Sequence, residues 1–167
     1  MKKPIAISIV LIMIITLSNL FPVNVAATSV NTAEKQMNHT RNIMKNKKED
    51  KRIILKVNDE VIEVEWVDNK TVSELKEALR HSDVTVESSR YGGVEQVGAL
   101  GRRFSTNDKR TTTEAGDIML YTGNHIVLFY GKHTWSYTRL GKIKNLGEKD
   151  IAALLNHKDV RITLQLK

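Results

Sequence analysis

The sequence of 167 residues contains no cysteine, only two prolines and few aromatic side chains, which make up 5% of its residues. The absence of cysteine excludes disulfides, thiolate nucleophiles and zinc or iron–sulfur centres held by cysteine. The five histidines form neither an HxH nor an HExxH pair, so we predict no metal site, and no motif requires a cofactor. A GxSxG motif and a complete phosphate-binding glycine loop are also missing, which argues against a serine hydrolase and against a nucleotide-binding enzyme.

Positive charge exceeds negative charge by seven at pH 7, but the excess is spread along the chain. Lysine and arginine outnumber aspartate and glutamate by two in residues 1–27, by two in residues 28–50 and by three in residues 51–167. A nucleic-acid-binding domain concentrates its positive charge on the folded part. We therefore expect no nucleic-acid partner, and the length predicts one modest domain.

The N-terminal residues predict a secretory signal peptide over residues 1–27. Lys2 and Lys3 precede an apolar run from Ile5 to Leu17, and the small residues that end at Ala27 suit a signal peptidase. The run is shorter than the roughly 18 residues of a membrane span, so a retained anchor is the weaker alternative. We expect cleavage after Ala27, no stable membrane span in the mature chain, and a bacterial protein that is secreted or associated with the cell envelope.

Residues 28–50 predict a flexible polar tether. They contain no aromatic residue and few apolar ones, so they cannot bury enough surface to offset the entropy of ordering. The folded domain is therefore expected to occupy residues 51–167.

Residues 51–167 show mainly the two-residue period of β-strands. Ile62, Val64 and Trp66 alternate with acidic residues, and residues 160–166 repeat this alternation. The segments 118–121 and 125–130 are apolar on both faces and flank a Thr-Gly-Asn turn, which predicts a hairpin that is buried on both sides. This hairpin is expected to lie at the centre of the core.

Helical spacing occurs in two short segments. One covers residues 72–79 after a predicted cap at Thr71, and the other covers residues 151–155 after Gly147. Many strands with two short helices predict a mostly β domain, a small closed or nearly closed β-barrel whose ends the helices cover. Because a barrel leaves no exposed sheet edge, we expect a monomer. The long polar segment from Gly101 to Gly116 is expected to be a loop, either mobile or functional.

The strongest candidate site is a strand over residues 135–139. Strand alternation puts Trp135, Tyr137 and Arg139 on one face. Trp, Tyr and Arg dominate binding hot spots, so this face predicts a groove for an extended peptide or a small polar molecule. The alternative is that the aromatic pair fills the barrel while Arg139 pairs with an acid such as Asp117 or Glu95.

The glycine-rich run at residues 91–101 leaves two alternatives open. It is either a sharp bend over one end of the barrel or a place where the backbone approaches a ligand closely. In the second case Glu95 and Gln96 would offer polar groups to that ligand, with Tyr91 beside them.

A further set of motifs runs from residue 91 to residue 143. The run YGGVEQVGALG is followed by a Gly116–Asp117 turn that opens a strand, by a Gly123–Asn124 turn, and by the strand Trp-Ser-Tyr-Thr-Arg leading into Leu140–Gly141. These features resemble the bacterial cyclophilin-like fold family, and the matching order of elements covers residues 52–166. The resemblance implies a small β-barrel with helices at its ends.

The resemblance also implies an activity. In true cyclophilins, an arginine on a Phe-His-Arg strand beside a hydrophobic pocket isomerises peptidyl-prolyl bonds. This sequence has no Phe-His-Arg motif, so no catalytic residue is assigned. We expect an exported module that binds a peptide or small molecule through Tyr91, Glu95, Trp135, Tyr137 and Arg139. The alternatives are a peptidyl-prolyl isomerase or folding helper, and a purely structural envelope protein.

Overall fold

The computed structural model describes residues 34–38 and 51–167. Residues 34–38 form a short, exposed helix, and the predicted signal peptide and the rest of the predicted tether lie outside the described residues. Residues 51–167 form a compact unit. In these two described ranges, no helix is long and apolar enough to cross a membrane.

The compact unit contains ten strands and two helices. In chain order they are β1 (Ile53–Val57), β2 (Glu60–Ile62), β3 (Val64–Trp66), α2 (Lys70–Leu79), β4 (Val84–Tyr91), β5 (Glu95–Ala99), β6 (Lys109–Thr112), β7 (Asp117–Tyr121), β8 (His125–Phe129), β9 (Thr134–Ile143), α3 (Glu148–Leu155) and β10 (Asp159–Leu166).

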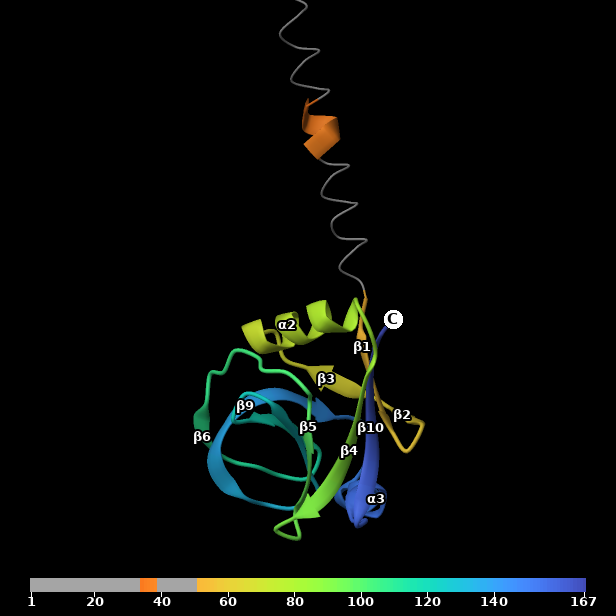
Figure 1. The fold of residues 1–167 in the computed structure, drawn as a ribbon, viewed down its shortest axis with the longest axis vertical. Coiled ribbons are helices and arrows are strands. Elements are labelled where there is room, and N and C mark those ends of the chain that lie inside the picture. Colours follow the sequence, from red (N-terminus) through yellow and green to blue (C-terminus); the bar gives the residue numbers. More distant parts are fainter. Residues whose placement is uncertain (1–33, 39–50) are drawn as a thin grey trace, which may run out of the picture. The chain divides into compact units, whose positions relative to one another are not determined.

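Nine of the strands form one antiparallel sheet that curls into a nearly closed barrel (Figure 1). Their order is β2-β1-β10-β4-β5-β8-β7-β9-β3, and β6 pairs with β9 outside this path. Its two end strands, β2 and β3, follow each other in the chain, and Trp66 Nε1 donates a hydrogen bond of 2.9 Å to the Ile53 carbonyl on β1. This bond ties β3 to β1 where the barrel comes nearest to closing. The prediction of a mostly β, barrel-shaped domain is therefore confirmed.

Tight turns with left-handed backbone angles join neighbouring strands. Between β1 and β2, Asn58 and Asp59 have φ angles of 49° and 71°, which suits a two-residue hairpin turn. Between β4 and β5, Gly92 and Gly93 have φ angles of 59° and 69°. The glycine-rich run thus bends sharply at its start, as one of its two interpretations required, and then continues as strand β5.

The main core lies on one side of the curled sheet and includes the buried faces of both helices. Leu75 of α2 and Leu155 of α3 contribute to it together with residues of the β7–β8 hairpin. The helices lie at opposite ends of the domain in Figure 1, α2 above β3 and α3 below, beside β10. The β7–β8 hairpin is buried on both faces, as the sequence predicts.

Two local predictions were wrong. Helix α2 is capped by Asn69, whose side-chain oxygen accepts a 2.8 Å hydrogen bond from the Val72 backbone N–H. Thr71 is already inside the helix, where its hydroxyl donates to the Ser105 carbonyl at 2.7 Å. The segment from Gly101 to Gly116 is also no continuous loop, because its residues 109–112 form β6 against β9.

Candidate functional site

Strands β5, β8, β7 and β9 lie next to one another and have two distinct buried faces. One face belongs to the main core and carries Ile118, Leu120 and Leu128. The opposite face has its own apolar cluster, with Val97 of β5 packed against it. In the cross-strand register, Glu95 lies opposite Phe129. Val127 lies opposite Val97 on one side and Met119 on the other. All five residues therefore share that second face. We call this second face the pocket face; it comprises Glu95, Val97, Met119, Tyr121, Val127, Phe129, Trp135 and Tyr137.

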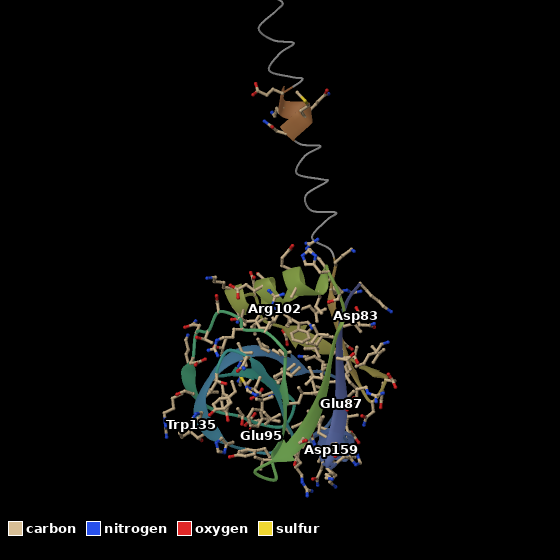
Figure 2. The ribbon with its side chains drawn as sticks, in the orientation of Figure 1. Asp83, Glu87, Glu95, Arg102, Trp135 and Asp159 are labelled. Carbon is tan, nitrogen blue, oxygen red and sulfur yellow. The ribbon has the colours of Figure 1, made fainter. Side chains whose placement is uncertain are left out.

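A cavity of about 480 Å³ opens on the pocket face. Its volume lies within the range of ordinary small-molecule sites. Trp135 and Tyr91 are 51% and 68% exposed and so form its solvent side. Figure 2 shows that Glu95 and Trp135 lie at the same, lower end of the barrel. The cavity, called the aromatic pocket below, is lined by Tyr91, Glu95, Val97, Tyr121, Val127, His133, Trp135 and Tyr137.

Tyr137 forms the rigid part of the pocket wall. Its ring meets Phe129 and Tyr121 edge to face, with ring centroids 5.4 and 5.9 Å apart, and His133 lies in the same relation at 6.5 Å. Such edge-to-face contacts stabilise the position of the ring in addition to the stabilisation that comes from burying its surface. Burial, with a smaller effect from Glu95, raises the pKa of Tyr137 to about 12, so its phenol stays neutral.

Glu95 is the one acidic side chain among the residues that line the pocket. The residue is only 6% exposed, and its Oε2 atom is buried without a hydrogen-bond partner among the described residues. Burial raises the pKa of this carboxyl to about 7. Near neutral pH the carboxyl is therefore divided between its protonated and ionised forms, which is unusual for a glutamate.

The neighbouring residue, Gln96, points to the opposite face, and both the nitrogen and the oxygen of its side-chain amide are hydrogen-bonded. Its side-chain nitrogen donates to the carbonyls of Leu155 and His157 at 2.8 and 2.7 Å, and its oxygen accepts from the Ser88 hydroxyl at 3.1 Å. These bonds hold the end of α3 against the sheet. Gln96, which the sequence suggested as a polar contact for a ligand, therefore serves the fold.

Arg139 lies on the same face of β9 as Tyr137 but is engaged with an acid. Its guanidinium donates two hydrogen bonds, of 2.8 and 3.2 Å, to the carboxylate of Asp117, which is almost fully buried. Burial opposes ionisation of Asp117, but the bonds from Arg139 and from the Glu114 backbone N–H, with Lys142 at 3.5 Å, lower its pKa overall. Of the two acids proposed from the sequence as partners of Arg139, the structure selects Asp117.

The structure thus brings four of the five predicted site residues together. Tyr91, Glu95, Trp135 and Tyr137 line one pocket, whereas Arg139 is not among its lining residues. Sequence reasoning did not single out Tyr121, His133, Val97 and Val127. The signal for Tyr121 was present, because five of the eight aromatic residues after Ala27 lie in the segment from Tyr121 to Tyr137.

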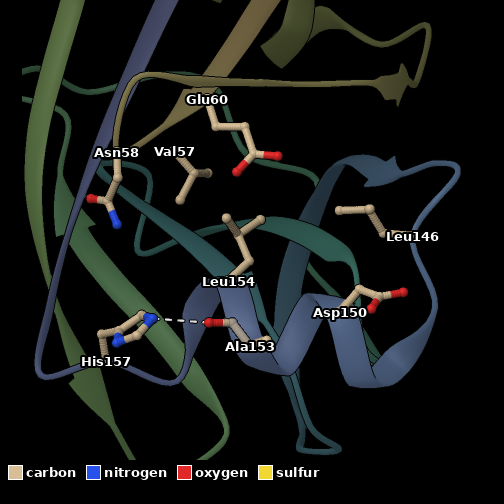
Figure 3. A pocket seen from close by; sticks show the side chains of 8 residues that line it. All are labelled: Val57, Asn58, Glu60, Leu146, Asp150, Ala153, Leu154 and His157. Atoms are coloured by element: carbon tan, nitrogen blue, oxygen red, sulfur yellow. Dashed lines mark hydrogen bonds between the residues drawn. The ribbon is translucent and has the colours of Figure 1, made fainter.

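A second depression lies between the β1–β2 turn and α3 (Figure 3). It measures about 430 Å³, and three of its polar residues, Asn58, Asp150 and His157, make local bonds. Asn58 accepts from the Arg161 backbone N–H at 3.0 Å, and His157 Nε2 lies 2.9 Å from the Ala153 carbonyl. We assign this depression no ligand. Within residues 34–38 and 51–167, no group of three or more acidic or histidine side chains is arranged to hold a metal ion.

Comparison with known proteins locates the chain in a family. The model of the Cyclophilin-like family matches residues 55–166, nearly the whole compact unit. Curated proteins yielded no match. Among solved structures, the solution structure of a hypothetical protein from Archaeoglobus fulgidus is 18% identical, with a TM-score of 0.47 over 69% of this chain and 93% of that chain. On the strength of the family match, the chain belongs to the cyclophilin-like family.

Proposed function

We propose that this cyclophilin-like domain is a binding module that holds a small molecule or a segment of extended peptide in the aromatic pocket. The observation that carries the proposal is the Glu95 carboxyl, which is buried in the pocket wall and whose Oε2 atom has no hydrogen-bond partner in residues 34–38 and 51–167. Leaving a buried polar atom without a hydrogen bond costs about 1–3 kcal/mol of stability. A ligand that supplies the missing partner recovers this free energy on binding.

The aromatic rings around Glu95 support the same proposal. Trp135 and Tyr91 keep large apolar surfaces exposed to solvent, and Tyr137 is fixed by its ring neighbours. Rigid aromatic side chains provide contact area at a low entropic cost, which is why they predominate at binding hot spots. A pocket with several aromatic walls and one buried polar group is typical of specific ligand recognition.

Isomerisation of proline bonds receives less support. A cyclophilin-type mechanism uses an arginine, aimed into an apolar pocket, that donates a hydrogen bond to the imide nitrogen as the bond twists. No lysine or arginine is among the residues that line the aromatic pocket, and Arg139 is bound to Asp117. We therefore favour binding without catalysis.

A titration followed by NMR tests the binding module. The full-length protein, labelled with ¹⁵N, receives a set of short Xaa-Pro and proline-free peptides, and exchange spectroscopy follows the cis and trans peptide signals. We expect shifts confined to the indole of Trp135 and to residues 91–97, without faster exchange. Accelerated exchange would assign the isomerase activity instead.

A matched pair of variants controls that titration. Trp135→Ala removes an exposed ring from the pocket, and Val61→Ala removes a similarly exposed apolar side chain from β2, far from the pocket in the sheet order. We expect the first variant to lose the shifts and the second to retain them. Equal binding by both variants would contradict the proposal.

We also propose that the domain acts outside the cytoplasm. The support is the pattern of residues 1–27, in which Lys2 and Lys3 precede an apolar run and small residues end at Ala27. Expression in a bacterial host, followed by N-terminal sequencing of the protein from the medium and the envelope, tests this. We expect a chain that begins at Thr28; an unprocessed chain in the cytoplasm would contradict it.

A further inference from the structure

We propose that the aromatic pocket recognises a primary ammonium group, which Glu95 receives as a hydrogen-bonding counter-ion between the surrounding rings. The inference rests on the proposed binding function and specifies its ligand class. The group is that of a lysine side chain in a peptide or of a free alkylamine, since both present the same –NH₃⁺ on an apolar stem.

The first argument is the state of the Glu95 carboxyl. Its Oε2 atom has no partner among the described residues, and the arginines of β4 and β9 are bonded to other side chains. Arg90 reaches the Asn156 side-chain oxygen at 3.4 Å, and Arg139 is bound to Asp117 at 2.8 Å. A buried carboxyl is stabilised by paired charge together with hydrogen bonds, and an ammonium group supplies both.

The second argument is the set of rings around the carboxyl. Tyr91, Tyr121, Trp135 and Tyr137 all line the same cavity as Glu95. The faces of such rings carry negative electrostatic potential and attract a cation that lies within about 6 Å. An anionic ligand would instead be repelled by Glu95, and a neutral ligand would leave this attraction unused.

The third argument is the linkage between ligand and proton. The titratable groups lining the pocket with Glu95 are the hydroxyls of Tyr91, Tyr121 and Tyr137 and the imidazole of His133. Outside this lining, the phenol of Tyr130 also interacts with Glu95: burial raises its pKa, Arg90 lowers it and the Glu95 charge raises it. Tyr137 stays neutral because its pKa is raised to about 12, and Glu95 itself titrates at about 7. An ammonium ligand binds the ionised carboxylate, so its affinity should rise with pH and level off above neutrality. Below the pKa the affinity should fall by about tenfold for each pH unit.

Isothermal titration calorimetry on the full-length protein tests the inference with two pairs of probes. The peptide acetyl-Gly-Lys-Gly-amide is compared with its norleucine analogue, and n-butylammonium is compared with butan-1-ol. At about pH 8 we expect each ammonium probe to bind at least tenfold more tightly than its neutral counterpart. If the peptide binds much more tightly than n-butylammonium, the source is a lysine in a chain; equal affinity points to a free amine.

Two variants identify the residue responsible. Glu95→Gln keeps the shape of the side chain but removes its negative charge, so it should abolish both the ammonium preference and the rise of affinity with pH. Glu60→Gln, which removes the same charge from an exposed position on β2 that is not among the residues lining the aromatic pocket, should retain both. The pH dependence of the unaltered protein provides a second test that does not require either variant to fold.

The outcomes separate this inference from the proposed function. Equal binding of lysine and norleucine peptides would overturn the ammonium inference and leave the binding module intact. Failure of both ammonium probes to bind would also overturn it, and the Xaa-Pro titration would then decide the binding module by itself. Ammonium binding that persists unchanged in Glu95→Gln would show that another group receives the cation and would equally overturn it.

Discussion

The two faces of strand β5 differ in how well their buried polar side chains are hydrogen-bonded. On the face towards α3, Gln96 has no exposed surface and makes three hydrogen bonds. On the pocket face, Glu95 is nearly as buried, yet its Oε2 atom makes no hydrogen bond within the part of the chain that the structure describes. The two residues are adjacent in the chain and have side chains of the same length.

This contrast separates residues that specify the fold from residues available to a ligand. A buried polar group that is fully satisfied fixes the relative position of two elements, here the sheet and the end of α3. A buried polar group left unsatisfied reduces stability and is retained in natural proteins mainly where function requires it. Four substitutions test the contrast, beginning with the largest expected effect.

The apolar core behind β8 should be the most sensitive region. Leu128 is fully buried, so Leu128→Ala should lower the free energy of unfolding by about 2–5 kcal/mol through lost burial and a new cavity. Urea unfolding monitored by circular dichroism measures this loss. The exposed Val61→Ala serves as the control and should change stability by less than about 0.5 kcal/mol. A small effect at Leu128 would show that the core face is loosely packed.

Removing the satisfied polar group should cost less than removing the core side chain. Gln96→Leu preserves volume but leaves the His157 carbonyl without its side-chain donor, so we expect a loss of about 1–3 kcal/mol. Hydrogen exchange should show the loss concentrated around the end of α3. A neutral or stabilising substitution would mean that the Gln96 network contributes specificity but no stability.

Substitution of Glu95 should have the opposite effect on stability at high pH, a gain where Gln96→Leu gives a loss. Its folded-state pKa of about 7 lies above the ordinary value of 4.5, so the folded protein holds this proton more tightly than the unfolded chain does. The resulting stability is complete below about pH 4.5 and is lost as pH rises through 7, by roughly 3 kcal/mol in all.

Glu95→Gln should remove this pH-dependent component. The variant should therefore be more stable than the unaltered protein at about pH 8 and nearly equal to it at about pH 5, as measured by urea midpoints. The comparison between the variants at each pH cancels the titration of all other groups. A constant difference across this range would show that Glu95 titrates normally.

Trp135 should have the smallest effect on stability and a large effect on binding. Because its side chain is half exposed, Trp135→Ala should change the free energy of unfolding by less than about 1 kcal/mol. The affinity for the best peptide or amine should nevertheless fall at least tenfold, as is typical of a hot-spot tryptophan. A comparable loss of stability would instead place Trp135 with the residues that hold the fold.

Much of the fold follows from local sequence patterns. The doubly buried β7–β8 hairpin was predicted from turn chemistry and apolar spacing, since it depends on residues close in the chain. Strand β6 was missed because its polar residues 109–112 acquire strand geometry only by pairing with β9. The cap of α2 was misplaced by two residues, since Asn69 and Thr71 both have side chains suited to capping and only the folded backbone distinguishes them.

The site was predictable only in part, for a different reason. Alternation along β9 correctly grouped Trp135 with Tyr137, but it could not show that Asp117 engages Arg139. The contrast between Glu95 and Gln96 is likewise invisible in the sequence, where they are adjacent polar residues. Whether a buried polar atom finds a partner depends on which distant strand or helix end packs over it.

The first and last strands of the domain have a consequence for how its chain could be rearranged. β1 and β10 are antiparallel neighbours, with Ile53 opposite Leu166, and the backbones of Arg52 and Lys167 exchange two hydrogen bonds. The two ends therefore already meet, and a short linker could join them without disturbing the barrel. The domain is therefore suited to circular permutation. New termini at an exposed turn such as Asn58–Asp59 would leave every strand beside its present neighbours.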